Sequence, residues 1–217
     1  MFHVGIYFSV ALSLVYFITP NWFVKALPIW TAALAAVEES PHPFAVSVAI
    51  GLFASSFGDI FLELDDDYGI DMFIPGLLCF LVAHLFYIRS FAGKMISTTW
   101  KTGFPLVVIY YIWIMSTLIP KVETALKAPV AVYGIAITTM ALFSINRFLS
   151  TEATSTSRLL SLLGSLSFVA SDSVLAFNKF HTPIKNAKTI VMITYYLGQI
   201  LIASSTQFLT ESNTKKK

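Results

Sequence analysis

Long apolar stretches separated by short polar links dominate the chain. A helix that crosses a bilayer needs about 20 predominantly apolar residues. Eight stretches approach this length: residues 2–19, 22–37, 43–62, 72–91, 102–119, 129–145, 159–177 and 188–208. They are continuous and do not alternate between polar and apolar positions, which favours helices. The pattern predicts an all-α integral membrane bundle of about eight transmembrane helices, forming a single polytopic membrane domain over residues 1–217. Seven spans are the alternative, because the second stretch is short and contains Lys25 and Pro28.

The composition agrees with a membrane location. Hydrophobic residues make up 56% of the chain and charged residues only 12%, whereas soluble domains carry about 25% charged residues. A net charge of +2 provides no general basic surface for nucleic acid. Several stretches are short for a span, which suits a thin bilayer such as that of the endoplasmic reticulum. We therefore expect an integral multi-pass protein of the endoplasmic reticulum or another endomembrane, surrounded by lipid.

A few polar residues interrupt the apolar stretches. Lys25, Asp59, His84 and Asp172 are ionisable residues within predicted spans, and such residues mark functional sites by default because burying them in a bilayer costs several kcal/mol. Spacing along the helices predicts that Lys25, Asp59 and Asp172 form a layer about 5–7 Å from one end of the bundle. His84 and Gln199 are predicted to lie deeper, about 17–18 Å from that end. Tyr87 and Tyr195 lie near these deeper groups at helical spacing.

The spacing of the polar residues also suggests that the two halves of the chain are related by an internal duplication. Asp59 is followed 25 residues later by His84, and Asp172 is followed 27 residues later by Gln199. In both cases the second residue lies one predicted helix further along. The spacing suggests two parallel four-helix repeats, an arrangement known in membrane proteins.

Each candidate also has a purely structural interpretation. Lys25 can extend from a helix end towards water, and Asp59 can end a helix before the acidic run from Glu63 to Asp67. Asp172 can be a hydrogen-bond partner between helices, and His84 can be a satisfied interior histidine. Tyr195 and Gln199, like Asp172, can simply join neighbouring helices.

Two carboxyl groups in a low-dielectric cavity favour acid-assisted hydrolysis. They cannot both ionise cheaply, so one tends to keep its proton while the other stays charged. The neutral acid can donate a proton, and the carboxylate can activate water or stabilise a developing cation. A metal site has less support, because the four histidines, His3, His42, His84 and His181, show no ligand spacing. A proton-coupled transporter and a non-enzymatic lipid-binding membrane protein remain the alternative functions.

Several motifs, taken in order, resemble the lysoplasmalogenase family, also called the YhhN or TMEM86 family, of eight-span membrane proteins. The resemblance covers residues 20 to 205 and is weakest in the fifth and sixth stretches. The motifs that carry it are Lys25-Ala26-Leu27-Pro28, Ser56-Phe57-Gly58-Asp59, Phe80 to Tyr87, Gly164 to Phe168, Ser171-Asp172-Ser173, Asn178-Lys179-Phe180 and Tyr195 to Gln199.

The resemblance implies hydrolysis of the vinyl-ether bond of alkenyl lysophospholipids taken from the bilayer. The products would be a fatty aldehyde and glycerophosphoethanolamine or glycerophosphocholine. Asp59 and Asp172 would be the catalytic acid and base, in an order that is left open. Lys25 would bind the head-group phosphate or influence the ionisation of a carboxylate. We expect a substrate-binding role for four further residues: His84, Tyr87, Tyr195 and Gln199. The scheme requires no metal and no organic cofactor.

Overall fold

The all-α fold is confirmed by the computed structural model, which describes residues 4–38, 42–69 and 71–209, without the side chains of residues 66–68. These residues form eight α-helices and no strand. The helices are α1 (Val4–Ile18), α2 (Trp22–Val37), α3 (Pro43–Tyr68), α4 (Phe73–Phe91), α5 (Phe104–Leu118), α6 (Thr124–Leu149), α7 (Ser155–Phe180) and α8 (Ala187–Ser204). A π-helical turn, Thr99–Gly103, precedes α5, and short 3₁₀ turns, Ile119–Lys121 and Ser205–Phe208, follow α5 and α8. Six of the helical segments are long and apolar enough to cross a membrane, whereas α1 and α2 are shorter.

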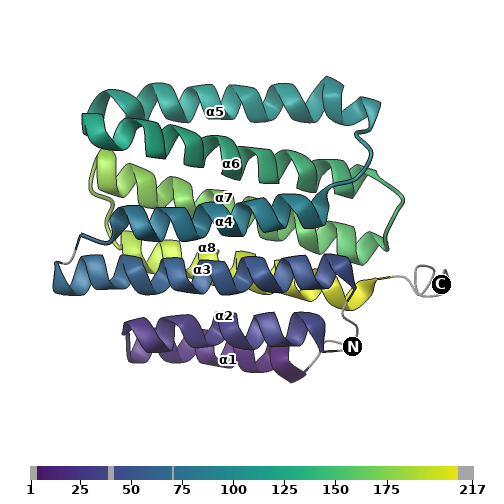
Figure 1. The fold of residues 1–217 in the computed structure, drawn as a ribbon, viewed down its shortest axis with the longest axis horizontal. Coiled ribbons are helices and arrows are strands. Elements are labelled where there is room, and N and C mark those ends of the chain that lie inside the picture. Colours follow the sequence, from purple (N-terminus) through teal and green to yellow (C-terminus); the bar gives the residue numbers. More distant parts are fainter. Residues whose placement is uncertain (1–3, 39–41, 70, 210–217) are drawn as a thin grey trace.

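The helices lie side by side in a bundle (Figure 1). The pairs α3–α4 and α7–α8 pack most extensively, and α2 contacts both α3 and α8. The helix α6 bridges α4 and α7, and α5 lies outside α6 at one edge of the bundle (Figure 1). Helices α1 and α2 form the opposite edge.

Three helices extend beyond the predicted stretches. The sequence places the end of the third stretch at residue 62, but α3 continues to Tyr68. Gly69 ends the helix in the left-handed conformation, with φ of 63°, and its N–H donates to the carbonyl of Asp65. Glu63 therefore lies inside the helix and not in an acidic loop. Helices α6 and α7 also extend beyond the apolar stretches, because helix caps and polar end residues do not register as hydrophobic.

Two glycines allow α7 and α8 to approach closely. A Cβ atom on Gly198 would lie 2.9 Å from the carbonyl oxygen of Gly164 and 3.0 Å from the backbone nitrogen of Phe168. A Cβ on Gly164 would lie 2.8 Å from the carbonyl oxygen of Gly198. Small residues at helix contacts let backbones pack directly, which is a common means of association in membranes. This contact sets the distance between the helices that carry Asp172 and Tyr195.

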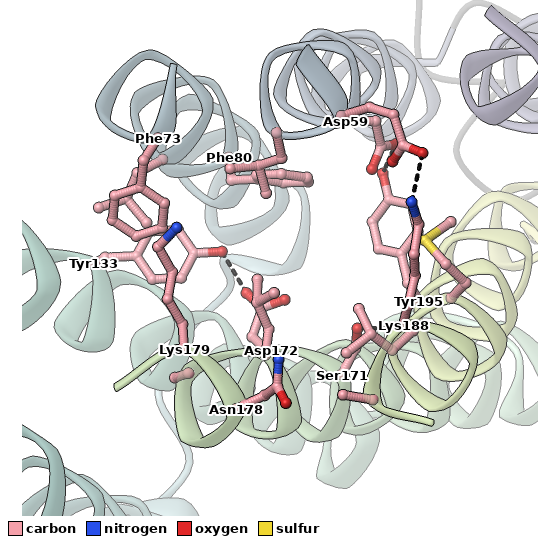
Figure 2. Close-up of a pocket in the computed structure, with 18 of the residues that line it drawn as sticks. Asp59, Phe73, Phe80, Tyr133, Ser171, Asp172, Asn178, Lys179, Lys188 and Tyr195 are labelled. Atoms are coloured by element: carbon pink, nitrogen blue, oxygen red, sulfur yellow. Dashed lines mark hydrogen bonds and ion pairs between the residues drawn. The ribbon is translucent and has the colours of Figure 1, made fainter. Parts of the chain in front are cut away.

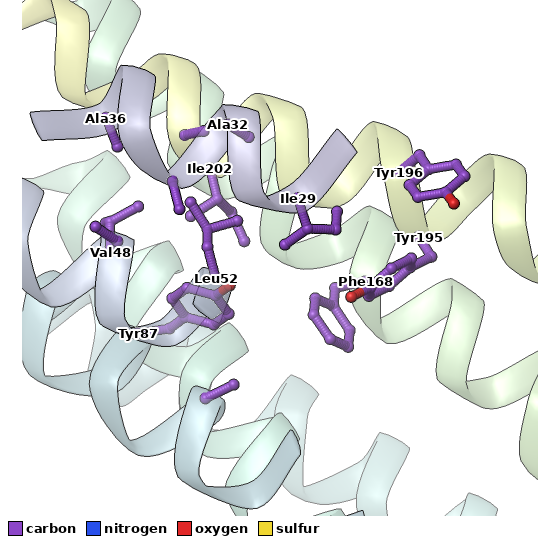
Figure 3. Close-up of a cluster of buried hydrophobic side chains, with 14 of the residues drawn as sticks. Ile29, Ala32, Ala36, Val48, Leu52, Tyr87, Phe168, Tyr195, Tyr196 and Ile202 are labelled. Carbon is purple, nitrogen blue, oxygen red and sulfur yellow. The ribbon is translucent and has the colours of Figure 1, made fainter. Parts of the chain in front are cut away.

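A cluster of aromatic and aliphatic side chains fills the centre of the bundle (Figure 3). Phe168 and Tyr87 are fully buried there, together with Leu52 and Ile202. The Phe168 ring lies 4.9 Å from the imidazole of His84, measured between ring centroids. This cluster forms the floor beneath the polar residues described next.

Candidate active site

One end of the bundle contains a cavity of about 160 Å³, here called the carboxylate cavity (Figure 2). The ends of six helices meet around it: the N-terminal parts of α2, α4, α6 and α8, and the C-terminal parts of α3 and α7. Its polar lining residues are Lys25, Asp59, Glu63, Tyr133, Ser171, Asp172, Asn178, Lys179, Lys188 and Tyr195. Apolar side chains complete the wall, among them Phe73, Leu77 and Phe80. The cavity thus places charged groups next to a surface suited to a hydrocarbon.

Asp59 lines the cavity from α3. The residue is only 3% exposed, and the Tyr195 hydroxyl on α8 donates a hydrogen bond of 2.5 Å to Asp59 Oδ2. A buried carboxyl group needs such partners because it loses its hydration. The hydrogen bond joins α3 to α8 and fixes the direction of the carboxyl group at the cavity wall.

Asp172 lies on a different wall, on α7 (Figure 2). The Tyr133 hydroxyl on α6 donates a short hydrogen bond to Asp172 Oδ2. His84 Nε2 lies 2.9 Å from the same hydroxyl oxygen and 4.0 Å from Asp172 Oδ2. Because the only hydroxyl proton of Tyr133 points to Asp172, the tyrosine oxygen accepts from His84 Nε2. His84, Tyr133 and Asp172 therefore form a hydrogen-bonded chain that ends at the cavity.

A charged triad borders the cavity next to Asp59. Glu63, one turn after Asp59 on α3, is only 1% exposed and binds two lysines. Lys25 Nζ lies 2.8 Å from Glu63 Oε2, and Lys188 Nζ lies 2.8 Å from Glu63 Oε1. Lys25 is buried, whereas half of the Lys188 side chain is exposed at the rim. The ion pair of Lys25 is therefore with Glu63.

Three polar side chains lie behind the cavity: His84, Tyr87 and Gln199. The Tyr87 hydroxyl donates a hydrogen bond of 2.7 Å to Gln199 Oε1, and both residues are fully buried. Gln199 Nε2 and His84 Nδ1 have no hydrogen-bond partner among the described residues. None of these three residues lines the cavity wall.

Four of the seven predicted site residues thus line the carboxylate cavity: Lys25, Asp59, Asp172 and Tyr195. The other three, His84, Tyr87 and Gln199, lie behind its wall. Sequence analysis missed Tyr133, Glu63 and Lys188. Glu63 was detectable, because it lies four residues after Asp59 and so shares its helix face. Tyr133 carried no comparable signal, since one tyrosine among nine in an apolar chain is unremarkable.

The two halves of the chain supply the site unequally. Asp59 receives its tyrosine from α8, in the other half, whereas Asp172 receives its tyrosine from α6, in its own half. The two carboxyl sites are therefore not copies of each other in their contacts. The parallel four-helix repeat stays a prediction.

A model of the YhhN family matches residues 20–206. The chain belongs to the YhhN family.

Curated relatives of this family member carry an enzyme name. This chain is 30% identical over 196 residues to a human protein named lysoplasmalogenase TMEM86A. The aligned region covers 86% of this chain and 79% of the relative. The chain is 31% identical to lysoplasmalogenase TMEM86B of Sus scrofa, over 86% of this chain and 76% of the relative. No solved structure matches the chain. All residues that line the carboxylate cavity fall within the matched range.

No three His, Cys, Asp or Glu side chains gather into a metal-binding group within the described ranges. His3, one of the four histidines considered above, lies outside them.

Proposed function

We propose that this YhhN-family protein hydrolyses the vinyl-ether bond of alkenyl lysophospholipids. The products are a fatty aldehyde and glycerophosphoethanolamine or glycerophosphocholine. The observation that carries the proposal is the pair Asp59 and Asp172, on two helices that face one cavity, each held by a tyrosine hydroxyl. The names of the curated relatives, lysoplasmalogenases TMEM86A and TMEM86B, support the same activity.

The reaction needs one acid and one base. One of the two carboxyl groups donates a proton to the vinyl carbon that is remote from the ether oxygen, and an oxocarbenium ion forms. The other, as a carboxylate, stabilises this cation and takes a proton from the water that adds to it. As the carbon–oxygen bond of the resulting hemiacetal breaks, its hydroxyl proton passes to the first carboxylate, and the second carboxyl group gives its proton to the leaving glycerol oxygen. The aldehyde and the glycerol hydroxyl are released, one water is consumed, and both carboxyl groups return to their starting states.

Neighbouring residues orient the reacting groups. Tyr195 and Tyr133 hold the two carboxyl groups, and His84 holds Tyr133 in turn. Such fixed geometry lowers the entropy cost of bringing the acid, the water and the ether together. Tyr87 and Gln199 support the floor of the site and do not line the cavity.

The lysines at the rim favour an anionic head group. Lys188 is half exposed, and Lys179 is 34% exposed with its Nζ 3.4 Å from Asp65. We assign the contact with the substrate phosphate to Lys188 and Lys179, because both line the outer part of the cavity. Lys25 lies deeper and acts through Glu63 and the neighbouring Asp59.

The membrane setting supplies the substrate. A single-chain lipid can reach the cavity from the bilayer without passing through water. Helix α2 has only 16 residues, which supports a thin bilayer such as that of the endoplasmic reticulum.

Aldehyde release from an alkenyl lysophospholipid tests the proposal. The purified protein in detergent micelles should release aldehyde from this substrate and not from the alkyl-ether analogue, which lacks the protonatable double bond. Asp59→Asn and Asp172→Asn should each lower the rate at least 100-fold, since each removes an acid–base group. Asp71→Asn is the matched control, because Asp71 is exposed and outside the cavity.

Three other outcomes would contradict the proposal. Activity that survives both cavity substitutions would remove the two-carboxylate mechanism. Loss of activity on treatment with a chelator would indicate that a bound metal ion, and not the two carboxyl groups alone, is needed for hydrolysis. Folded wild-type protein that releases no aldehyde would favour a transporter or a lipid-binding protein, and ligand uptake into vesicles would then separate these two.

A further inference from the structure

A second cavity, of about 60 Å³, lies between α5, α6 and α7. It shares four lining residues with the carboxylate cavity, and these stand between the two spaces: Val130, Tyr133, Asp172 and Ala176. We call it the α5 cavity. Its remaining walls include Ile114 and Met115 of α5 and Val169 of α7.

The α5 cavity offers a ligand an almost wholly apolar surface. Apart from Tyr133 and Asp172, its polar lining residues are Tyr110, Thr138 and Ser173, and each hydroxyl already has a protein partner. Tyr110 and Ser173 are hydrogen-bonded at 2.5 Å, and Ser173 donates to the carbonyl of Val169. Thr138 donates to the carbonyl of Gly134 at 2.6 Å. Apolar cavities of this kind stay dry and bind apolar molecules.

The α5 cavity is also one helix away from the lipid. Helix α5 lies at the edge of the bundle and packs chiefly on α6 (Figure 1). Its outer face is exposed, with Leu106 at 63% and Ile109 at 66%. Its contact with α7 is small and includes the Tyr110–Ser173 hydrogen bond and the ring contact of Trp113 with Phe177.

The order of these features matches the order of groups in a single-chain ether lipid. From the rim inward come the lysines, then the two carboxyl groups, then the α5 cavity beyond Asp172. We infer that the α5 cavity holds the first carbons of the substrate's hydrocarbon chain, with the rest of a long chain passing between α5 and α7 into the bilayer. This inference rests on the proposed function, since it places the vinyl ether beside Asp172. A cavity of this size takes only the carbons next to the ether bond.

Filling the α5 cavity tests the inference. Val169→Phe adds a ring from α7 about one helical turn from Asp172, and Ile114→Phe adds a ring from α5. The matched controls are Leu166→Phe on α7 and Ile112→Phe on α5, since Leu166 is 44% exposed and Ile112 is 58% exposed. Neither control residue lines the carboxylate cavity or the α5 cavity. Because the two variants are on different helices, the inference can still be tested with one of them if the other fails to fold.

The substrates are alkenyl lysophospholipids with chains of sixteen and two carbons, the second chain being the vinyl group alone, assayed in the same mixed micelles. Each cavity variant should lower kcat/KM for the sixteen-carbon substrate at least tenfold. For the two-carbon substrate, which has no further carbon to place in the α5 cavity, kcat/KM should fall less than threefold. The controls should match the wild type on both. Cavity variants that treat the two lengths alike, whether both are cleaved normally or both are lost equally, would overturn the inference.

Binding separates this inference from the proposed function. The alkyl-ether analogues of both chain lengths are not hydrolysed, so their dissociation constants report binding without the chemical step, and the difference between the two lengths reports the contribution of the chain. The long analogue should bind the Val169→Phe variant at least tenfold more weakly than the wild type. Suppose the wild-type protein hydrolyses neither substrate, but Val169→Phe weakens binding of the long analogue alone. The proposed function then fails, and the assignment of the α5 cavity to the hydrocarbon chain is supported. If the wild type hydrolyses both substrates and the variant binds both analogues normally, only the assignment of the α5 cavity fails.

Discussion

The Tyr195 hydroxyl donates a 2.5 Å hydrogen bond to Asp59 across 136 residues of sequence. The bond links α8 to α3, and a corresponding bond from Tyr133 links α6 to Asp172 on α7. Each carboxyl group of the cavity is therefore oriented by a helix other than its own. Rotation or sliding of one helix would misplace an acid or base relative to the substrate, so the packing of the bundle is part of the proposed catalytic apparatus.

Removal of either tyrosine hydroxyl should impair catalysis more than folding. Tyr195→Phe and Tyr133→Phe each delete one hydrogen bond to a carboxyl group, which costs about 1–3 kcal/mol. We expect kcat to fall about 10- to 100-fold, because the acid or base loses its fixed direction. Aldehyde release under saturating substrate measures this change. Tyr111→Phe is the control, since its hydroxyl makes only a 3.4 Å contact with the Ala131 carbonyl and should leave kcat unchanged. Unchanged kcat in both test variants would mean that the tyrosines do not position the carboxyl groups.

Glu63→Gln should destabilise the protein. Glu63 balances the buried ammonium group of Lys25, and removing one partner of a buried ion pair costs about 3–5 kcal/mol. The midpoint of thermal unfolding in detergent should therefore fall clearly. The double variant Lys25→Met, Glu63→Gln should recover part of the loss, because no buried charge is then left without its partner. A double variant no more stable than Glu63→Gln would show that the unpaired charge of Lys25 is not the cause of the destabilisation.

Lys188→Met should weaken substrate binding with little change in kcat. Lys188 lies at the rim, with 51% of its side chain exposed, and we assign it to the substrate phosphate. We expect KM to rise about threefold to tenfold, since charge-assisted hydrogen bonds contribute more than neutral ones. Lys185→Met, an exposed lysine outside the cavity, is the matched control. A fall in kcat at constant KM would instead assign Lys188 to the chemical step.

Gly198→Ala should destabilise the α7–α8 contact. Its Cβ would lie 2.9 Å from the Gly164 carbonyl oxygen and 3.0 Å from the Phe168 nitrogen, and neither backbone atom can move alone. Overpacking of this kind costs about 1–3 kcal/mol, and activity should fall as well because Asp172 and Tyr195 shift apart. Gly93→Ala is the control, since its Cβ would meet only the flexible end of the Glu152 side chain. Thermal unfolding of the two variants, measured in parallel, tests the difference; equal midpoints would contradict it.

The sequence by itself determined the helices and the principal carboxyl groups. A span of about 20 apolar residues is a local property, since the bilayer requires each helix to satisfy its own backbone hydrogen bonds. The eight stretches could therefore be located without knowledge of their packing. Asp59 and Asp172 stood out for the same reason, because an acidic side chain in such a stretch is costly wherever the helix lies.

Only the tertiary structure decided which groups meet. Helix rotation and register bring Tyr133 to Asp172 and Tyr195 to Asp59, and neither pairing leaves a mark in local hydrophobicity. Glu63 lies just outside the third predicted stretch, 43–62, because a charged residue ends an apolar stretch. In the structure Lys25 and Lys188 neutralise it and α3 continues past it. His84, Tyr87 and Gln199 were predicted at the site and lie behind its wall, since depth along a helix does not determine which way a side chain points.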